Sequence, residues 1–195
     1  MVTIYYTATT LDGFLADENN SLDWLFEVEG DADHPTQSGE FFAGIGAMAM
    51  GATTYAWVLA HEKVLDDPGK WRTWYGDIPL WVFTHRDLTP VPGAAVHLTQ
   101  DDVRSVHAAM AEAAGGKNIW LVGGGDLVGQ FADEGLLDEI QLSVAPVTLG
   151  TGAPLLPRRL LAADLSLESV SRNGQFVDLT YRVHARAGAD TSPGG

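Results

Sequence analysis

The chain has 195 residues, a formal net charge of −15 and no cysteine. Its length suits one core, so we expect a single domain over residues 1–184 and a flexible tail over residues 185–195. The charge argues against binding to nucleic acid or an anionic membrane, and the lack of cysteine excludes disulfides and thiolate metal sites. The N-terminus lacks a signal-peptide pattern, and no apolar run approaches the roughly 20 residues of a membrane span, so we expect a cytoplasmic protein.

The first half of the chain predicts strands and helices separated by polar loops. The expected segments are, in order, a strand over residues 2–9, a turn over residues 11–14, a polar loop over residues 17–21, an acidic loop over residues 27–39, a short helix over residues 41–45, a buried strand over residues 47–50, a helix through Tyr55, Val58 and Leu59, and a loop over residues 61–77. Pro35 and Pro68 support the two longer loops.

The second half alternates between strands and helices more regularly. Strands are expected over residues 80–83, 95–98, 118–122, 140–147, 165–171 and 176–183, and a loop over residues 149–157. One helix is expected over residues 126–133, and another through the apolar stripe of Val103, Val106, Met110 and Ala113. Thr99 and Asp102 resemble a helix cap, and Asn173-Gly174 is typical of a hairpin turn. The alternation predicts an α/β fold with a central, mostly parallel sheet flanked by helices and a C-terminal antiparallel hairpin.

Three consecutive glycines, Gly123, Gly124 and Gly125, follow an apolar strand and precede a helix. Glycines let a backbone approach a bulky ligand, and a helix N-terminus offers unpaired N–H groups to an anion. The pattern favours a phosphate or pyrophosphate site, and the alternative is a tight turn without a ligand. The dinucleotide and P-loop fingerprints do not fit, because Val128 replaces the third glycine of the first and no Ser or Thr follows Lys117 for the second.

Two further strand ends carry residues that suit an anionic ligand. The expected strand over residues 80–83 is followed by Thr84, His85 and Arg86. Arginine offers a planar fork suited to phosphate, and ligands of open α/β sheets gather where strands end. The expected strand over residues 47–50 is followed by Gly51, Thr53 and Thr54. A threonine at this place is, read alone, more typical of an N-cap.

Other residue types give weaker indications. Asp12 and Glu40 could supply a proton, and Trp24 and Phe42 could stack on a flat heterocycle, although turn, capping and core roles are more common for such residues. The six histidines show no metal-ligand spacing, and no G-x-S-x-G elbow occurs. We therefore expect neither a metal site nor serine hydrolase chemistry.

Six short motifs occur in a recognisable order. They are TLDGFLA at residues 10–16, MGATTY at residues 50–55, FTHR at residues 83–86, LVGGG at residues 121–125, GLLDEI at residues 135–140 and PVTLGTG at residues 146–152. Together they resemble the dihydrofolate reductase-like family, and more closely its single-domain members related to the reductase domain of bifunctional riboflavin-biosynthesis proteins. The resemblance covers residues 2–184.

This resemblance implies a dihydrofolate reductase-like sheet and NADPH as the hydride donor. It implies cofactor contacts at Ala8, Gly51, Thr53, Thr54, Thr84, His85, Arg86, Val122, Gly123, Gly124, Gly125, Asp126 and Leu127. It implies a substrate site near Thr10, Trp24 and Phe42. The chain departs from the family pattern at Ala52, where arginine is usual, and at Ala56, where glutamate is usual. One cationic contact to the cofactor is therefore missing.

The expected function is an NADPH-dependent reductase that transfers a hydride to a pyrimidine- or pterin-like heterocycle or to a small carbonyl compound. Asp12 is the first candidate for the proton donor, and Glu40 is the second. The alternatives are a non-catalytic NADP(H)-binding protein and a true dihydrofolate reductase. A small-molecule substrate is expected, and neither nucleic acid nor a membrane is an expected partner.

Two further expectations concern charge and assembly. Arg86 is the one fixed cation in the three junctions that could bind a dinucleotide, so we expect it to pair with the 2′-phosphate of NADPH. We also expect a homodimer, as is common in the riboflavin-type branch. The late strands carry apolar residues on both of their alternating sets, among them Leu142, Val144, Leu165, Leu167 and Val170.

Overall fold

The computed structural model describes residues 1–28 and 39–184, apart from the side chain of Glu40. The expected tail and most of the expected acidic loop over residues 27–39 lie outside the described residues. The strands are β1 (Thr3–Thr10), β2 (Phe14–Ala16), β3 (Ile45–Gly51), β4 (Leu80–Phe83), β5 (Val96–Thr99), β6 (Asn118–Gly123), β7 (Glu139–Ala145), β8 (Ala153–Pro154), β9 (Leu165–Asn173) and β10 (Phe176–Val183). The helices are α1 (Asp23–Phe26), α2 (Gly39–Ala43), α3 (Ala52–His61), α4 (Gly69–Tyr75), α5 (Val103–Ala114) and α6 (Gly125–Asp133).

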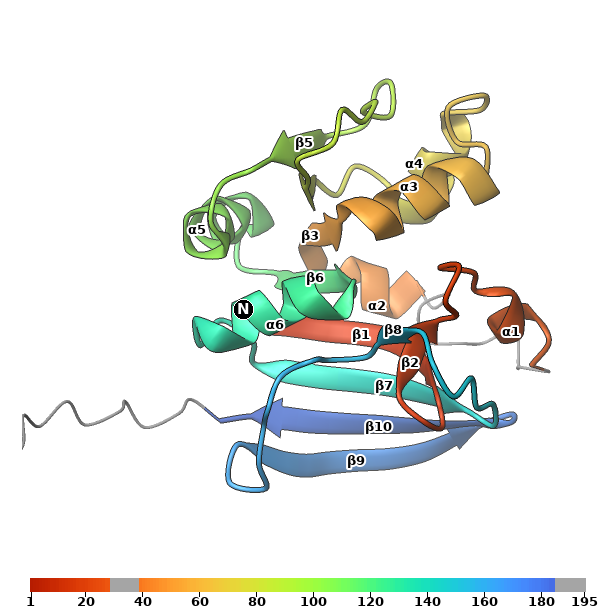
Figure 1. Ribbon diagram of the computed structural model, residues 1–195. Helices are drawn as coiled ribbons and strands as arrows, with labels where there is room; N and C mark the ends of the chain where they lie inside the picture. The colour runs from red at the N-terminus through yellow and green to blue at the C-terminus, as the bar shows by residue number, and fades with distance from the viewer. Residues whose placement is uncertain (29–38, 185–195) are drawn as a thin grey trace, which may run out of the picture.

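Eight strands form one sheet in the order β5-β4-β3-β6-β1-β7-β10-β9, and β2 pairs with β8 in a small separate ladder (Figure 1). The strands from β5 to β7 in this order run parallel, and β10 and β9 continue the sheet antiparallel. The predicted mostly parallel sheet with a C-terminal hairpin is therefore confirmed. Because parallel strands end at one edge, the loops that follow β1, β3, β4 and β6 come together there.

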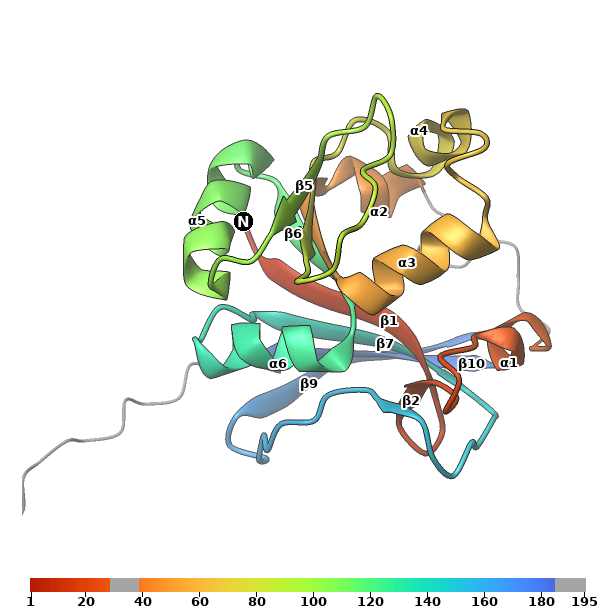
Figure 2. The same ribbon diagram turned by 45° about the horizontal axis from the view of Figure 1, so that its top comes forward.

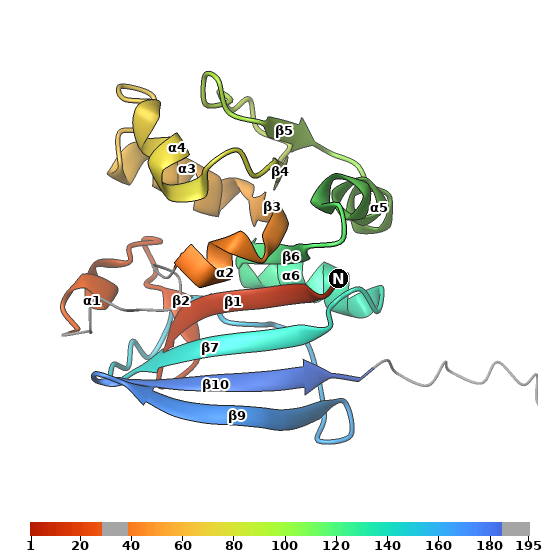
Figure 3. The same cartoon turned by 180° about the vertical axis from the view of Figure 1, so that it is seen from behind.

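Helices cover both faces of the parallel part of the sheet. Tyr5 and Leu121 belong to the core under α5 and α6, and α6 lies in front of the sheet in Figure 1. Ile4 and Trp120 belong to the core under α2, α3 and α4, and α2 lies in front of the sheet in Figure 3. We call these two sides the α6 face and the α2 face. Side chains alternate between them with the period of two that a strand imposes.

One helix occupies a segment that was expected to be a loop. Residues 61–77 contain α4, in which the buried Trp71 packs against Tyr75 with ring centroids 4.6 Å apart. Residues four apart share one side of a helix, so this pair gives α4 an apolar side that covers the α2 face. The loop prediction is wrong here because Pro68 and Gly76, which are typical of turns, flank a helix of only seven residues.

The smallest elements were also missed. β8 lies inside the expected loop over residues 149–157 and pairs with β2, which follows the expected turn after β1. Strands of two and three residues are too short to show an alternation of polar and apolar side chains. The helix α1 is a single turn of four residues, which is too short to show the spacing of apolar residues that indicates a helix.

The cap and stripe of α5 differ in detail from the prediction. Asp102 is the N-cap, because its side chain accepts a hydrogen bond from the Ser105 backbone N–H at 2.9 Å, and Thr99 does not cap the helix. The buried stripe consists of Val103, Val106, Met110 and Ala114. Ala113 is exposed, because 3.6 residues per turn bring the eleventh rather than the tenth following residue back to the same side.

The exposed apolar residues of the C-terminal hairpin gather on one face. Leu142 of β7 pairs with Leu179 of β10, which pairs with Val170 of β9. The register shift between Thr180 and Tyr181 leaves an extra residue in β9, so Leu167 and Val170 point to the same side. The expectation of apolar residues on both alternating sets is therefore wrong. The residues named in that expectation gather on the α6 face, and the α2 face of the hairpin is polar apart from the buried Phe176.

Candidate functional site

The loops after the parallel strands meet at the carboxyl edge of the sheet. A Cβ added to Gly51 would lie 3.9 Å from the Gly123 carbonyl oxygen, and one added to Gly123 would lie 3.9 Å from Thr54 Oγ1. Helices α3 and α6 both begin near this point and run in opposite directions (Figure 2). Two helix N-termini therefore lie at this edge, and their unpaired N–H groups attract anions.

The N-terminus of α3 has no side-chain cap. Gly51 occupies the N-cap position with φ −78° and ψ 160°, and no side chain accepts a cap hydrogen bond there. Thr53 and Thr54 lie inside the first turn, so the N-cap interpretation of these threonines is wrong. The first N–H groups of α3 have no side-chain partner and Thr53 is exposed, so both can contact a ligand.

Arg86 reaches from the end of β4 back to this helix start. Its Nη2 donates a hydrogen bond to Thr53 Oγ1 at 3.4 Å, and its backbone N–H donates to Thr84 Oγ1 at 2.9 Å. Thr84 is buried, whereas His85 and Arg86 are exposed. A guanidinium fork beside an uncapped helix N-terminus is an arrangement that suits a phosphate group.

The glycine turn over residues 123–125 depends on close backbone contacts. Gly123 has a φ of +147°, which favours glycine. At Gly125 an added Cβ would lie 2.4 Å from the carbonyl oxygens of both Pro154 and Leu155. Gly124 is the N-cap of α6, without a side-chain cap, and an added Cβ there would meet nothing within 4 Å. The second helix start is therefore open at Gly124.

The neighbours of this turn differ in what they can offer a ligand. The Val122 side chain packs against the core of the α2 face, and Leu127 is buried in the core of the α6 face. Leu127 can therefore contribute only its backbone. Asp126 is exposed, and its carboxylate accepts a hydrogen bond from Arg158 Nη1 at 3.1 Å. That ion pair offsets a negative charge beside the α6 N-terminus.

Asp12 joins the loop that follows β1 to the loop that follows β7. Its Oδ1 accepts from the Thr10 hydroxyl at 2.6 Å, and its Oδ2 accepts from the backbone N–H groups of Leu149 and Gly150 at 3.0 and 2.7 Å. The hydrogen bond from Thr10, followed by those from Gly150 and Leu149, lowers the pKa of Asp12. An ionised carboxylate with both oxygens engaged suits a positioning role better than proton donation. Thr10 is buried and also accepts from the Phe14 N–H at 2.9 Å, so it belongs to the same joint.

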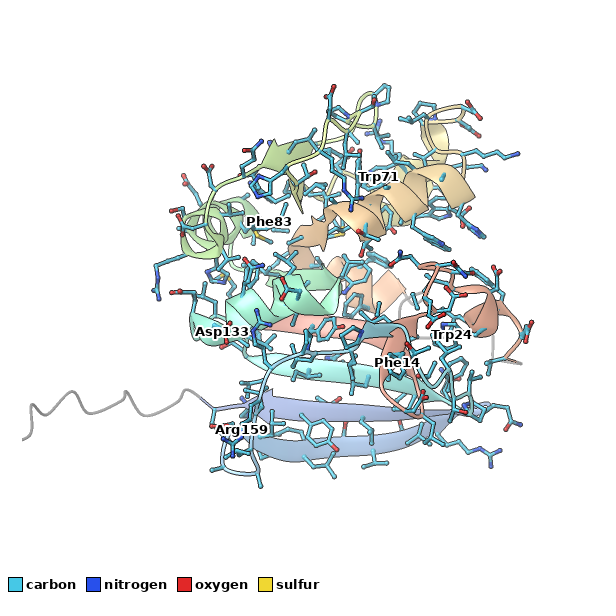
Figure 4. All side chains as sticks on the ribbon, viewed as in Figure 1. Phe14, Trp24, Trp71, Phe83, Asp133 and Arg159 are labelled. Carbon is cyan, nitrogen blue, oxygen red and sulfur yellow. The ribbon has the colours of Figure 1, made fainter. Side chains whose placement is uncertain are left out.

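Trp24 and Ala8 lie together on the α2 face. Trp24, labelled in Figure 4, comes from α1 and packs with Ala8, Ala145 and Phe176. In the part of the chain that the structure describes, the Trp24 Nε1 is the one buried side-chain nitrogen or oxygen without a hydrogen-bond partner. The sequence singled out the Trp24 ring but carried no sign of this unpaired donor.

The other two predicted residues are placed differently. Phe42 packs edge-on against Phe41, Tyr75 and Trp120, with ring centroids 5.6–6.3 Å apart, inside the core of the α2 face. This contact set is that of a core residue. The side chain of Glu40 lies outside the described residues.

Two features near the site were not foreseen. Ser143 is fully buried, and its hydroxyl donates to Asp178 Oδ1 at 2.6 Å on the α2 face. In the sequence, each of these polar residues stands between two apolar residues of a strand, and polar residues in such an alternation usually face solvent. The rings of Trp57 and Phe26 both stack with His61, at centroid distances of 4.4 and 5.2 Å, and so join α3 to α1.

The family of the chain follows from its similarity to known proteins. A model of the RibD C-terminal domain matches residues 2–177. The chain belongs to the RibD C-terminal domain family. This RibD-type domain is 34% identical over 181 residues to the uncharacterized protein YwjB of Bacillus subtilis (strain 168), and the match covers 92% of this chain and 96% of YwjB.

Solved structures agree with the RibD-type assignment. A protein from Shewanella sp. PV-4, provisionally assigned to riboflavin biosynthesis, has a TM-score of 0.71 and 26% identity over 94% of this chain and 99% of its own. Dihydrofolate reductase from Enterococcus faecalis, solved with NADP(H), has a TM-score of 0.59 and 12% identity over 93% of this chain and 96% of its own. The RibD-type domain therefore has the dihydrofolate reductase-like fold that its motifs implied. None of its described helices is long and apolar enough to cross a bilayer.

Proposed function

We propose that this RibD-type domain is an NADPH-dependent reductase that transfers a hydride to a pyrimidine- or pterin-like heterocycle or to a small carbonyl compound. The observation that carries the proposal is the meeting of two uncapped helix N-termini and the Arg86 guanidinium at one edge of the sheet. Membership of the RibD family and the NADP(H) complex of a protein with the same fold support it. When bound, the nicotinamide supplies the hydride.

The residues at the edge fit the phosphates of such a cofactor. The start of α6 at Gly124 would hold the pyrophosphate through backbone N–H groups. The start of α3, with Thr53 and Arg86, would hold the 2′-phosphate. Arg86 carries particular weight because the net charge of −15 opposes the approach of a polyanion and Ala52 contributes no charge.

Asp12 would position the loops at the end of β1 rather than donate a proton, because both its oxygens are engaged and its pKa is lowered. Glu40 remains the other candidate for the proton donor. The engagement of Asp12 is also the observation that favours a second candidate function, an NADP(H)-binding protein without catalysis.

The two functions are separated by following the nicotinamide absorbance band of NADPH in the presence of pteridines, aminopyrimidines and small carbonyl compounds. The reductase proposal expects a decrease that depends on both the protein and one of these compounds. Tight NADPH binding without turnover of any of them would favour the second function. A failure to bind NADPH would contradict both.

We also propose that two copies associate through the apolar face of the hairpin. Leu167, Val170 and Val177 are 54%, 59% and 43% exposed on the α6 face. Exposed apolar side chains that gather on one face are typical of an interface. Light scattering should give twice the chain mass of 20.9 kDa, and Leu167→Glu combined with Val170→Glu should give a monomer. A monomeric wild-type protein at high concentration would contradict the proposal.

A further inference from the structure

Trp24 carries a buried donor without an acceptor. The residue is only 7% exposed, and its indole N–H has no hydrogen-bond partner. Buried N–H groups in native proteins are almost always paired, since leaving one unpaired destabilises the fold. An unpaired donor at this position therefore points to a partner that residues 1–28 and 39–184 do not supply.

The hydrophobic packing partners of Trp24 offer its indole N–H no side-chain acceptor. Its packing partners on the sheet are Ala8 of β1, Ala145 of β7 and Phe176 of β10, and Val147 and Leu149 lie in the same cluster. Ala8 is also the residue beside which the nicotinamide is expected.

A carboxylate lies in the same row of paired residues as Ala8, on the α2 face. Ala8 pairs with Ser143, and Ser143 pairs with Asp178, so these three residues form one row across β1, β7 and β10. The buried Ser143 donates to Asp178 Oδ1 at 2.6 Å and fixes the carboxylate. Asp178 is two residues from Phe176, on which Trp24 packs, which corresponds to about 6.6 Å along the strand.

One oxygen of this carboxylate remains available. Among the described residues, no side chain or backbone N–H donates a hydrogen bond to Asp178 Oδ2. Asp178 is partly exposed, whereas Ser143 beneath it is fully buried. The unpaired donor of Trp24 therefore belongs to a cluster that includes Ala8, and the open acceptor of Asp178 lies in the same row of the sheet as Ala8.

We propose that the Trp24 indole N–H and the Asp178 carboxylate bind the polar groups of the substrate ring, with Ser143 as the residue that positions Asp178. Trp24 donates to a ring carbonyl, and Asp178 accepts from a ring N–H. The pair selects planar N-heterocycles that present both groups, as a lactam does. This inference rests on the proposed reductase function and assigns residues to its substrate site.

Lumazine and 1,3-dimethyllumazine form a matched pair of probes, because the two methyl groups replace the ring N–H donors and leave the carbonyls in place. Each is titrated against the full chain saturated with NADPH, with 15N-labelled tryptophan as the reporter. The indole N–H resonance of Trp24 is identified as the one that disappears in Trp24→Phe. Lumazine should shift this resonance. It should bind about tenfold or more tightly than the dimethyl form, the effect of one hydrogen bond to a charged group.

Variants locate the effect on the proposed residues. Asp178→Asn should weaken lumazine binding about tenfold and erase the preference over the dimethyl form, whereas NADPH affinity should stay the same. Ser143→Ala should reduce the preference in the same direction. Asp101→Asn, an exposed aspartate after the edge strand β5, is the control and should change neither affinity.

The inference is overturned if NADPH-saturated protein does not bind lumazine, if binding leaves the Trp24 resonance unmoved, or if both lumazines bind equally well. A wild-type protein that does not bind NADPH would contradict the proposed function instead. The lumazine titrations would then be made on the free protein and judged by the same two criteria, the Trp24 resonance and the preference for the N–H form.

Discussion

Replacing Arg86 with alanine removes the fixed cation beside the start of α3. The Arg86 side chain is exposed and its hydrogen bond to Thr53 Oγ1 is long, at 3.4 Å, so the fold should be little affected. A hydrogen bond between charged groups contributes about 1.5–3 kcal/mol, so NADPH affinity should fall about 10- to 100-fold. NADH lacks the 2′-phosphate, and its affinity should change far less.

Fluorescence titration of both cofactors against wild type and Arg86→Ala measures this difference. Arg172→Ala is the matched control, because it removes another exposed arginine, from the hairpin, and changes the net charge by the same amount. The control should leave both affinities unchanged. An equal loss for both cofactors in Arg86→Ala would refute the pairing with the 2′-phosphate, and no loss for either would remove Arg86 from the site.

Three further predictions concern the glycine turn, the partly buried His107 and the hydrogen bonds of Asp12. Gly125→Ala should lower the free energy of unfolding in urea by about 1–3 kcal/mol because its Cβ meets two carbonyl oxygens, whereas Gly124→Ala, with open space, should be nearly neutral. Burial lowers the pKa of His107, so the unfolded chain binds its proton first, and wild type should lose stability relative to His107→Gln as the pH falls below about 6.5. Equal losses in both proteins would show that His107 is not responsible. Asp12→Asn should raise the substrate KM and leave the pH profile of kcat unchanged, and a lost limb of that profile would make Asp12 the proton donor.

The sheet could be predicted because its parallel strands are apolar runs that end in polar or glycine-rich segments. Such runs precede Gly51, Thr84 and Gly123, and each of these residues lies at the expected edge. The helix around Trp71 could not be predicted, because its stability comes from tertiary packing against the sheet rather than from its seven residues. In the sequence, the turn-forming residues Pro68 and Gly76 indicate a loop more strongly than Trp71 and Tyr75 indicate a helix.

The proposed phosphate-binding part of the site could be predicted from the sequence because it is built from backbone N–H groups at strand ends and one arginine. The Ser143–Asp178 pair could not, because it depends on the register of β7 and β10, which no local pattern specifies. The bulge in β9 could not be predicted either, because it also depends on how the strands pair. It turns Leu167 and Val170 to one face, whereas their spacing in sequence predicts opposite faces.

The claim that the chain is a reductase is tested most directly by following the transferred hydrogen. NADPH deuterated at the transferring position of the nicotinamide is incubated with the protein and each heterocycle or carbonyl compound of the panel, and the products are examined by mass spectrometry. A reductase should give a reduced product that carries deuterium from the cofactor. Bound NADPH that passes no deuterium to any compound of the panel would contradict the claim.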